Sequence, residues 1–368
     1  MLAAFTFNTA ENLPIGLLEL IADSLRVSVS AVGLLVTGYG VTVAVASLPL
    51  AHVMRTAPRR HVLTGLLAAL VVSSLVAALA TSYWVLLGAR LLTALAQALF
   101  WAVGLFAPGI RGRVVGALSV AGSLALVVGV PAGSRLGRQS GWPVPVAVTA
   151  GLGAVSLVTI AVLLPTSRPE EEPAAYGTGP DARRFGVVLA AGALSAAGAF
   201  PGYTYIVKFL GDVSGFSPST VSALLVAFGA ACLAGVSITG VLLDRFPHVA
   251  LTAAVATQAV GMLGLYVAGS DPVAAAVFVM MVGGALGPVF MTTQNEMLRC
   301  APGRTDLALA ANSDAYNAGI AAGAALGGLV LPLADVRGTF LAGGLLTVGA
   351  CAVLLGGRLL RPGPGSAE

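Results

Sequence analysis

Runs of about 20 consecutive, mostly apolar residues recur along the whole chain and constrain its fold more than any other feature. A helix of this length can cross the ~30 Å hydrocarbon core of a bilayer. Backbone amides in lipid must be bonded within the protein, so a spanning segment is a helix or a barrel strand. Because the runs are continuous, without strict alternation of polar and apolar residues, they predict helices. The 57% of hydrophobic and 9% of charged residues exclude an ordinary soluble domain.

The pattern predicts twelve spans, at 3–22, 30–53, 62–80, 84–107, 113–135, 144–165, 185–209, 218–243, 249–268, 273–298, 305–331 and 338–359. The only long polar segment, 166–184, contains three glutamates and three prolines and is interpreted as a flexible linker. It divides the chain into an N-terminal half, 1–165, and a C-terminal half, 185–368, with six spans each. The expected fold class is therefore an all-α membrane protein built from two pseudo-symmetric six-helix halves.

Basic residues predict the orientation, because cytoplasmic loops of membrane proteins are enriched in Lys and Arg. With both termini in the cytoplasm, thirteen arginines fall on the inner side and four on the outer side. We therefore expect a multi-pass protein of the cell membrane with both termini inside. The formal charge of +4 is attributed to this topology and not to nucleic-acid binding. The first span has no basic leader and no small-residue cleavage site, so we expect it to be a retained helix.

The two halves carry traces of an internal repeat. The connection at 51–60 and the connection at 240–249 have a similar pattern, and aligning Pro58 with Pro247 gives an offset of 189 residues. Paired six-helix halves are a transporter plan in which the binding site lies at the membrane midplane between the repeats.

Glu11 and Arg90 are ionisable residues that fall deep inside predicted spans. Glu11 lies near the middle of the first span, and Asn8 shares its helix face one turn earlier. A charge at this depth costs at least ~2.5–3.5 kcal/mol and usually marks an ion or substrate path. Arg90, inside the fourth span, needs acceptors or water, and a structural ion pair is the alternative to a role in coupling. Desolvation disfavours the charged form of Glu11, although Arg90 or a cationic substrate would keep it ionised; the sequence leaves both open.

Several polar and aromatic residues of the spans are candidates for substrate binding: Asn8, Phe100, Trp101, Tyr203, Tyr205, Asp314 and Asn317. The aromatic residues of this set either wall a pocket or pack between helices. Asp314 either binds a cationic substrate or pairs within the bundle. Glu19 and Glu296 lie near span ends, where we expect solvated positions at the rim. Lys208 is expected to extend to the outer interface.

Glycines recur every four residues at Gly129, Gly133 and Gly137, and again at positions 319, 323 and 327. Small faces of this kind let helix backbones approach closely in lipid. They serve either packing alone or a gate between the two halves, and Pro131 adds a kink by freeing a carbonyl one turn earlier.

Three motifs carry a resemblance to a known family. The loop Gly240-x-Leu-x-Asp244-Arg245-x-Pro247 resembles the signature loop of the major facilitator superfamily. Its first-half copy is degenerate, with Ala51 in place of the usual Gly and Arg55 in place of the usual Asp.

The other two motifs lie in the fourth and fifth spans. The stretch from Arg90 to Gln97 resembles the fourth-helix arginine motif, with Ala94 in place of the usual Gly. The stretch from Gly122 through Gly129-Val-Pro131-Ala-Gly133 resembles the fifth-helix motif of the antiporters.

The first span, Tyr203-Thr-Tyr205-Ile and Asn317-Ala-Gly-Ile resemble the branch of twelve-helix drug and sugar exporters that includes arabinose efflux and chloramphenicol resistance proteins. The resemblance implies a proton-coupled antiporter that exports a drug, an antibiotic or a sugar by alternating access. It assigns a role in proton coupling to Arg90, and we expect protons to pass through Glu11, the ionisable residue near the middle of the first span. It also implies a conformational latch at Gly240, Asp244 and Arg245, for which a plain polar turn is the alternative.

No feature of the sequence indicates an enzyme. A phosphate-binding loop of the Walker type is absent, so we expect no direct use of ATP. The three cysteines are scattered and indicate neither a disulfide framework nor a metal site. The expected partners are a small-molecule substrate, protons and the lipid bilayer, with no cofactor beyond the proton gradient, and the protein is expected to be a monomer. An uptake symporter on the same fold and a non-transporting membrane sensor remain as alternatives.

Overall fold

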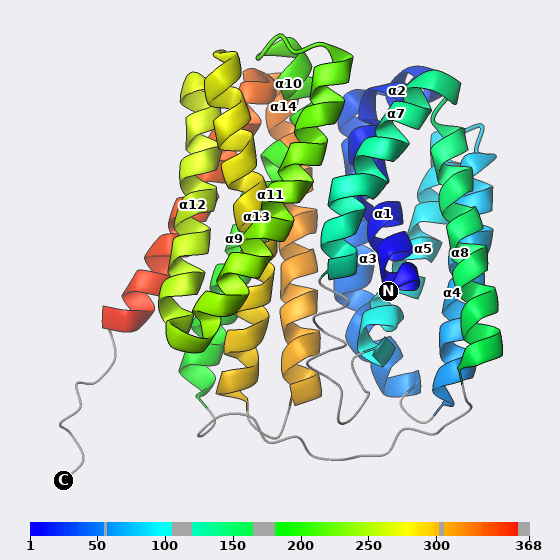
Figure 1. The fold of residues 1–368 in the computed structure, drawn as a ribbon, viewed down its shortest axis with the longest axis horizontal. Helices are drawn as coiled ribbons and strands as arrows, with labels where there is room; N and C mark the ends of the chain where they lie inside the picture. The colour runs from blue at the N-terminus through cyan, green and yellow to red at the C-terminus, as the bar shows by residue number, and fades with distance from the viewer. Residues whose placement is uncertain (55–56, 105–119, 165–180, 302–304, 360–368) are drawn as a thin grey trace.

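The computed structural model describes residues 1–54, 57–104, 120–164, 181–301 and 305–359, and within these residues the chain is helical without a strand. The expected all-α fold is confirmed. Two helix bundles stand side by side (Figure 1). The first contains α1 (Leu2–Gly16), α2 (Leu18–Leu25), α3 (Val29–Met54), α4 (Arg59–Ala78), α5 (Tyr83–Gly104), the π-helix η1 (Ala125–Gly129), α7 (Val130–Ser140) and α8 (Pro143–Leu163). The second contains α9 (Ala182–Tyr203), α10 (Ile206–Asp212), α11 (Pro218–Arg245), α12 (Pro247–Ala268), α13 (Pro272–Cys300) and α14 (Thr305–Leu359).

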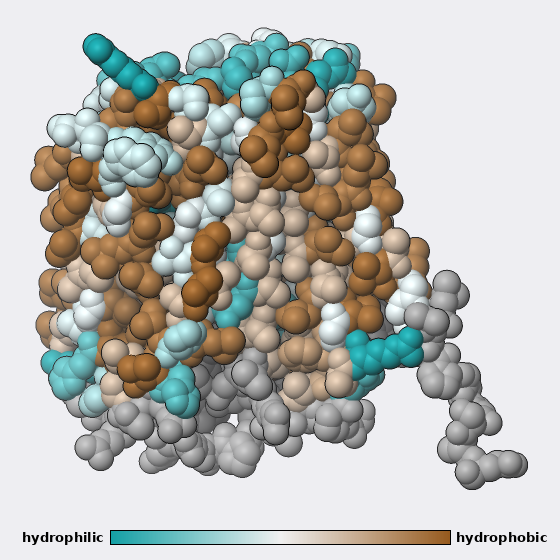
Figure 2. Space-filling model, turned by 180° about the vertical axis from the view of Figure 1, so that it is seen from behind, coloured by the Kyte–Doolittle hydropathy of each residue, from teal (hydrophilic) through white to brown (hydrophobic). Residues whose placement is uncertain are grey.

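Ten helices of the described chain are long and apolar enough to cross a membrane. One of them, α14, contains two spans, because Ala334 and Asp335 leave the helical conformation in its middle. The first span consists of the short helices α1 and α2, which are separated only at Leu17. Each of the twelve predicted spans is thus represented among the described residues. On the face shown in Figure 2, a broad apolar surface lies below a polar upper edge, and polar residues appear again at its lower edge.

Prolines in the first turn and capping side chains mark the starts of several helices. A proline occupies the first turn of α8, α11, α12 and α13, where its missing N–H costs no hydrogen bond. The side chains of Asp181, Ser217 and Asp271 cap α9, α11 and α13 by accepting from backbone N–H groups three residues on. Residues 166–180 of the predicted linker lie outside the described chain, and α9 begins at Ala182, within the last predicted linker residues.

The halves meet along two seams, where α3 packs on α14 and where η1 and α7 pack on α11. We call the end where α8 finishes and α9 begins the linker end, and the end that carries α2 and α10 the far end (Figure 1). At the far end Arg138 of α7 donates to Ser222 of α11 over 2.6 Å. Tyr205 packs there between Gly33 of α3 and Gly328 of α14. These contacts join the two halves at the far end.

Candidate functional site

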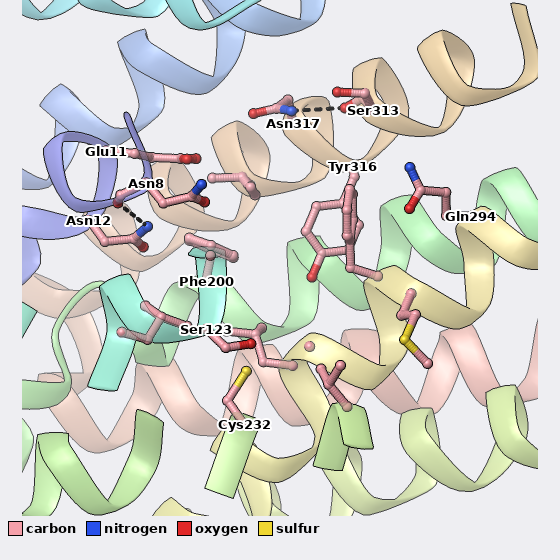
Figure 3. A pocket seen from close by; sticks show the side chains of 18 of the residues that line it. Asn8, Glu11, Asn12, Ser123, Phe200, Cys232, Gln294, Ser313, Tyr316 and Asn317 are labelled. Carbon is pink, nitrogen blue, oxygen red and sulfur yellow. Dashed lines mark hydrogen bonds between the residues drawn. The ribbon is translucent and has the colours of Figure 1, made fainter. Parts of the chain in front are cut away.

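A cavity of about 180 Å³ lies between the halves, in the middle of the molecule (Figure 3). Both halves supply its wall. Its polar lining consists of amides, hydroxyls and one carboxylate: Asn8, Glu11, Asn12, Gln97, Ser123, Gln294, Ser313, Tyr316 and Asn317. Phe200 and Phe290 add aromatic surface, and the Phe290 ring meets the Tyr316 ring edge to face with centroids 5.0 Å apart. Toward the linker end the lining extends to Gln294 and Ser313.

The carboxylate of Glu11 lines this cavity and is held by an amide. Gln97 of α5 donates its Nε2 to Glu11 Oε2 over 2.6 Å. Tyr39 of α3 in turn donates to Gln97 Oε1 over 2.6 Å. Both supporting side chains are buried, at 2% exposure for Gln97 and 1% for Tyr39. Glu11 is thus held by a hydrogen bond from α5, and the donor side chain is in turn held by α3.

Arg90 binds the backbone of α1 and not the carboxylate of Glu11. One guanidinium nitrogen donates to the carbonyl of Ala10, and Nη2 donates to the carbonyl of Glu11 over 2.9 Å. Pro14 lacks an N–H, so the carbonyl of Ala10 has no partner within the helix. The guanidinium also stacks on the Tyr39 ring, 4.5 Å from its centroid. Arg90 therefore supplies the hydrogen-bond donor that Pro14 denies to the carbonyl of Ala10, one residue before Glu11 in α1.

Asparagine side chains face the cavity in a repeated arrangement. Asn8, Asn12 and Asn317 each donate Nδ2 to the carbonyl four residues earlier in their own helix, over 2.8, 3.0 and 2.9 Å. Each Nδ2 group thus spends one of its two hydrogens within its own helix, and the oxygen of Asn317 is buried without a protein partner. The wall therefore offers several hydrogen-bond acceptors to a ligand, with Glu11 among them, beside the donors of its hydroxyls and amides.

A family model of the Major Facilitator Superfamily matches residues 1–313 of the chain. The chain belongs to the major facilitator superfamily. This is a family of transporters, so the protein is a multi-pass membrane transporter and not an enzyme.

One relative within the superfamily is a probable sugar efflux transporter of Mannheimia succiniciproducens, 31% identical over 344 residues, which covers 89% of this chain and 85% of the relative. Two solved structures share the fold. The human organic anion transporter MFSD10 gives a TM-score of 0.74 at 16% identity, over 96% of this chain and 97% of that one. A point mutant of the nucleoside transporter NupG gives 0.72 at 11% identity, over 97% of this chain and 98% of that one.

Three of the four aromatic candidates for the binding site lie outside the lining of this cavity. Phe100 packs on Phe7 with ring centroids 4.7 Å apart. Tyr203 is 2% exposed and stacks on Phe228 at 5.2 Å. Tyr205 is fully buried at the far-end seam. The side chain of Trp101 lies outside the described residues. The three described rings thus fill helix interfaces, which spacing in the sequence does not distinguish from a pocket wall.

Asp314 also lies away from the cavity lining, beside Ser47 of α3 at the seam between the halves. Its neighbour Asn317, one turn further along α14, does reach the cavity. The side chain of Asp244 in the superfamily loop lies outside the described residues. Arg245 of the same loop is exposed, and Gly240 faces Met291 of α13.

The two glycine faces pack within each half and not between the halves, which corrects the predicted position of a gate. A Cβ at Gly129 would meet Thr9 of α1, and one at Gly133 would meet Leu13 of the same helix. Pro131 lies in the first turn of α7, directly after the π-helix, and its backbone continues the helix. The second glycine set approaches Ala193, Ala197 and Pro201 of α9 in the same way. Contact with the other half comes instead from Gly229 of α11, which meets the backbone at Val127.

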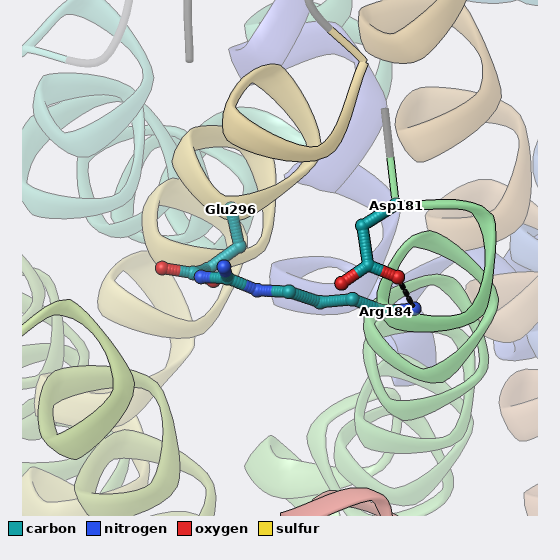
Figure 4. Close-up of polar contacts among 3 residues, drawn as sticks. All are labelled: Asp181, Arg184 and Glu296. Carbon is teal, nitrogen blue, oxygen red and sulfur yellow. Dashed lines mark hydrogen bonds and ion pairs between the residues drawn. The ribbon is translucent and has the colours of Figure 1, made fainter. Parts of the chain in front are cut away.

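The predicted rim position of Glu296 is wrong. Its side chain is 1% exposed and forms an ion pair with Arg184 of α9 (Figure 4). Arg184 sits one turn after the capping residue Asp181, so the start of α9 is tied to α13 near the linker end. The predicted span 273–298 places Glu296 near its end. Its ion-pair partner Arg184, however, belongs to a helix more than 100 residues away in the sequence.

Gln97, Asn12, Ser123 and Gln294 are lining residues that the sequence analysis did not assign to the site. A signal for the first was present, since Gln97 follows Arg90 by seven residues and shares its helix face. Two polar residues on one face of an otherwise apolar span point to a common buried neighbour. That neighbour is α1.

Proposed function

We propose that the protein exports a small, neutral, hydroxyl-rich molecule of the sugar class in exchange for protons. The observation that supports this most directly is the wall of acceptors around Glu11. Asn8, Asn12 and Asn317 each commit one Nδ2 hydrogen to their own helix and present their oxygens as acceptors. Sugar hydroxyls are donors that match such a wall, whereas an organic anion would meet the Glu11 carboxylate. The sugar efflux relative agrees with this substrate class.

Glu11 is the group that we assign to proton coupling. It is the carboxylate of the cavity lining, and the same cavity would receive the substrate. A proton and a substrate that compete for one carboxylate would bind alternately, which is the requirement for exchange. Each occupant would favour one arrangement of the two halves.

The proposed orientation rests on the distribution of basic residues, and the proposed transport cycle rests on the contacts between the two halves. With both termini in the cytoplasm, the far end faces outward. The contact from Arg138 to Ser222 then belongs to a state closed to the outside. The halves would rock about the central cavity to expose it alternately. We propose that the working unit is a monomer, since one chain supplies every described wall of the cavity.

Proteoliposomes with an imposed pH gradient test this function. Radiolabelled L-arabinose is a first substrate, followed by a panel of disaccharides and cationic drugs. Glu11→Gln keeps the shape and the hydrogen bond from Gln97 but cannot titrate. We expect uphill, pH-driven transport to be lost while downhill exchange of a neutral sugar is retained. Normal uphill transport by this variant at equal expression would refute the assignment. Proton and sugar movement in the same direction would instead establish a symporter.

A further inference from the structure

The carboxylate of Glu11 is held by an amide whose orientation is itself fixed. Gln97 has one acceptor oxygen and one NH₂ group with two donors. The Tyr39 hydroxyl occupies the acceptor over 2.6 Å, so the NH₂ group is the part that reaches Glu11 Oε2. A flipped carboxamide would offer its oxygen to Glu11 and leave the Tyr39 hydroxyl without its acceptor. In a buried site a lost partner of this kind is costly.

This arrangement treats the two oxygens of Glu11 differently. Oε2 accepts from Gln97, while the described residues give Oε1 no hydrogen-bond partner. A hydrogen bond from an N–H to a charged oxygen is stronger than one to a neutral oxygen. The fixed NH₂ group therefore favours the ionised carboxylate, and a proton is taken up at Oε1 without disturbing the contact with Gln97.

We propose that Gln97, oriented by Tyr39, is a positioning residue that makes Oε1 of Glu11 the proton-exchanging oxygen and sets the pH at which exchange occurs. The proposal rests on the proposed coupling role of Glu11. It assigns a function to the buried pair of α3 and α5 that neither the family nor the relative's name supplies.

Other titratable groups act on Glu11 from several helices. Arg90 of α5 places its guanidinium at the carbonyl of Glu11. Tyr39 of α3, Tyr203 of α9 and Tyr316 of α14 are the remaining titratable side chains that interact electrostatically with Glu11. In the described part of the chain, no such group comes from the other elements packed on α1, which are α2, α4, α7, α8, α10 and η1. All four groups stay in place in the variants below, apart from the single hydroxyl that Tyr39→Phe removes.

The test measures protonation of Glu11 directly and needs no transported substrate. Dicyclohexylcarbodiimide reacts with protonated carboxyl groups in apolar surroundings. The purified full-length protein is labelled in detergent micelles over a pH series, and the peptide that carries Glu11 is quantified by mass spectrometry. Gln97→Leu removes the donor and should raise the labelling midpoint by about one pH unit.

Tyr39→Phe is the milder variant. It frees the carboxamide to flip and accept from the protonated acid, so the midpoint should rise as well, while the ring under Arg90 is kept. The double variant should show only the Gln97→Leu shift, because Tyr39 acts through Gln97. Gln258→Leu is the matched control. Gln258 is also fully buried and bonds Ser195 and Thr347 in the other half, so its loss should lower the melting temperature and leave the midpoint unchanged.

An unchanged midpoint in both Gln97→Leu and Tyr39→Phe, in folded protein that labels at Glu11, would overturn the proposal. So would an equal shift in the Gln258→Leu control. Failure of the proposed function gives a different result. In that case Glu11→Gln would keep pH-driven efflux, whatever the labelling midpoints of the other variants.

Discussion

Arg90→Ala should destabilise the protein strongly, because Arg90 supplies a hydrogen bond that α1 cannot make for itself. The guanidinium donates to the carbonyls of Ala10 and Glu11, and Pro14 removes the internal partner of the former. The Ala10 carbonyl left without a donor costs about 1–3 kcal/mol. Loss of the stacking on Tyr39 adds about 1–2 kcal/mol. Since water can enter the space that is vacated, we expect the free energy of unfolding to fall by about 2–4 kcal/mol.

A second substitution separates this structural role from a role in coupling. Pro14→Ala restores an N–H that can bond the carbonyl of Ala10, so in the Arg90→Ala background it should recover about 1–3 kcal/mol. Equilibrium unfolding in mixed micelles, followed by circular dichroism, measures both variants and the Pro14→Ala control. If the positive charge beside Glu11 is also needed for coupling, the double variant should still fail in pH-driven transport.

If Arg90→Ala unfolded with the same free energy as the wild type, the role of Arg90 as the hydrogen-bond donor to the Ala10 carbonyl would be refuted. Recovery of both stability and pH-driven transport in the double variant would show that Arg90 is needed only for the helix break. Arg90→Lys is expected to be intermediate, because an ammonium lacks the fork that reaches two adjacent carbonyls.

Two further predictions concern the packing of the helices. Gly129→Ala should destabilise by about 1–3 kcal/mol because its Cβ would overlap Thr9, whereas Gly151→Ala on the open face of α8 should be neutral or slightly stabilising in the same unfolding assay. Equal effects of the two would contradict the packing of η1 on α1. Arg138→Cys with Ser222→Cys, in a background without the three native cysteines, should become joined by a short bifunctional methanethiosulfonate. Transport should stop and return with reductant; full transport by the joined protein would exclude opening at this seam.

Much of the fold was predictable because lipid imposes a simple rule on the chain. Apolar runs of spanning length predicted the helices, and the split of α14 at Ala334 and Asp335 falls between two predicted spans. Prolines in the first turn of α11 and α13 were a further signal of helix starts that the sequence carries, because of their missing N–H. The glycine faces were recognised as sites of close approach, but not which helix approaches. A small face admits any neighbour, and only the packing of α1 and α9 within their own halves decided it.

The candidate site was predictable in part. Glu11 stood out because a carboxylate in an apolar span is costly unless it faces a cavity or a partner. Arg90 stood out for the same reason, but its partners did not, since they are two backbone carbonyls of another helix, one of them freed by Pro14. Glu296 was misplaced because its distance from a span end says nothing about Arg184, which lies across the bundle.

The sequence by itself thus determined the number of spans, their helical form, the superfamily motifs and the two charges that need an explanation. These properties depend on local composition and on the cost of polar groups in lipid. The tertiary structure decided which side chains share a space: the acceptor wall of Asn8, Asn12 and Asn317, and the chain from Tyr39 through Gln97 to Glu11. Such groupings join residues of separate helices, and their geometry arises only when the two halves pack around the cavity.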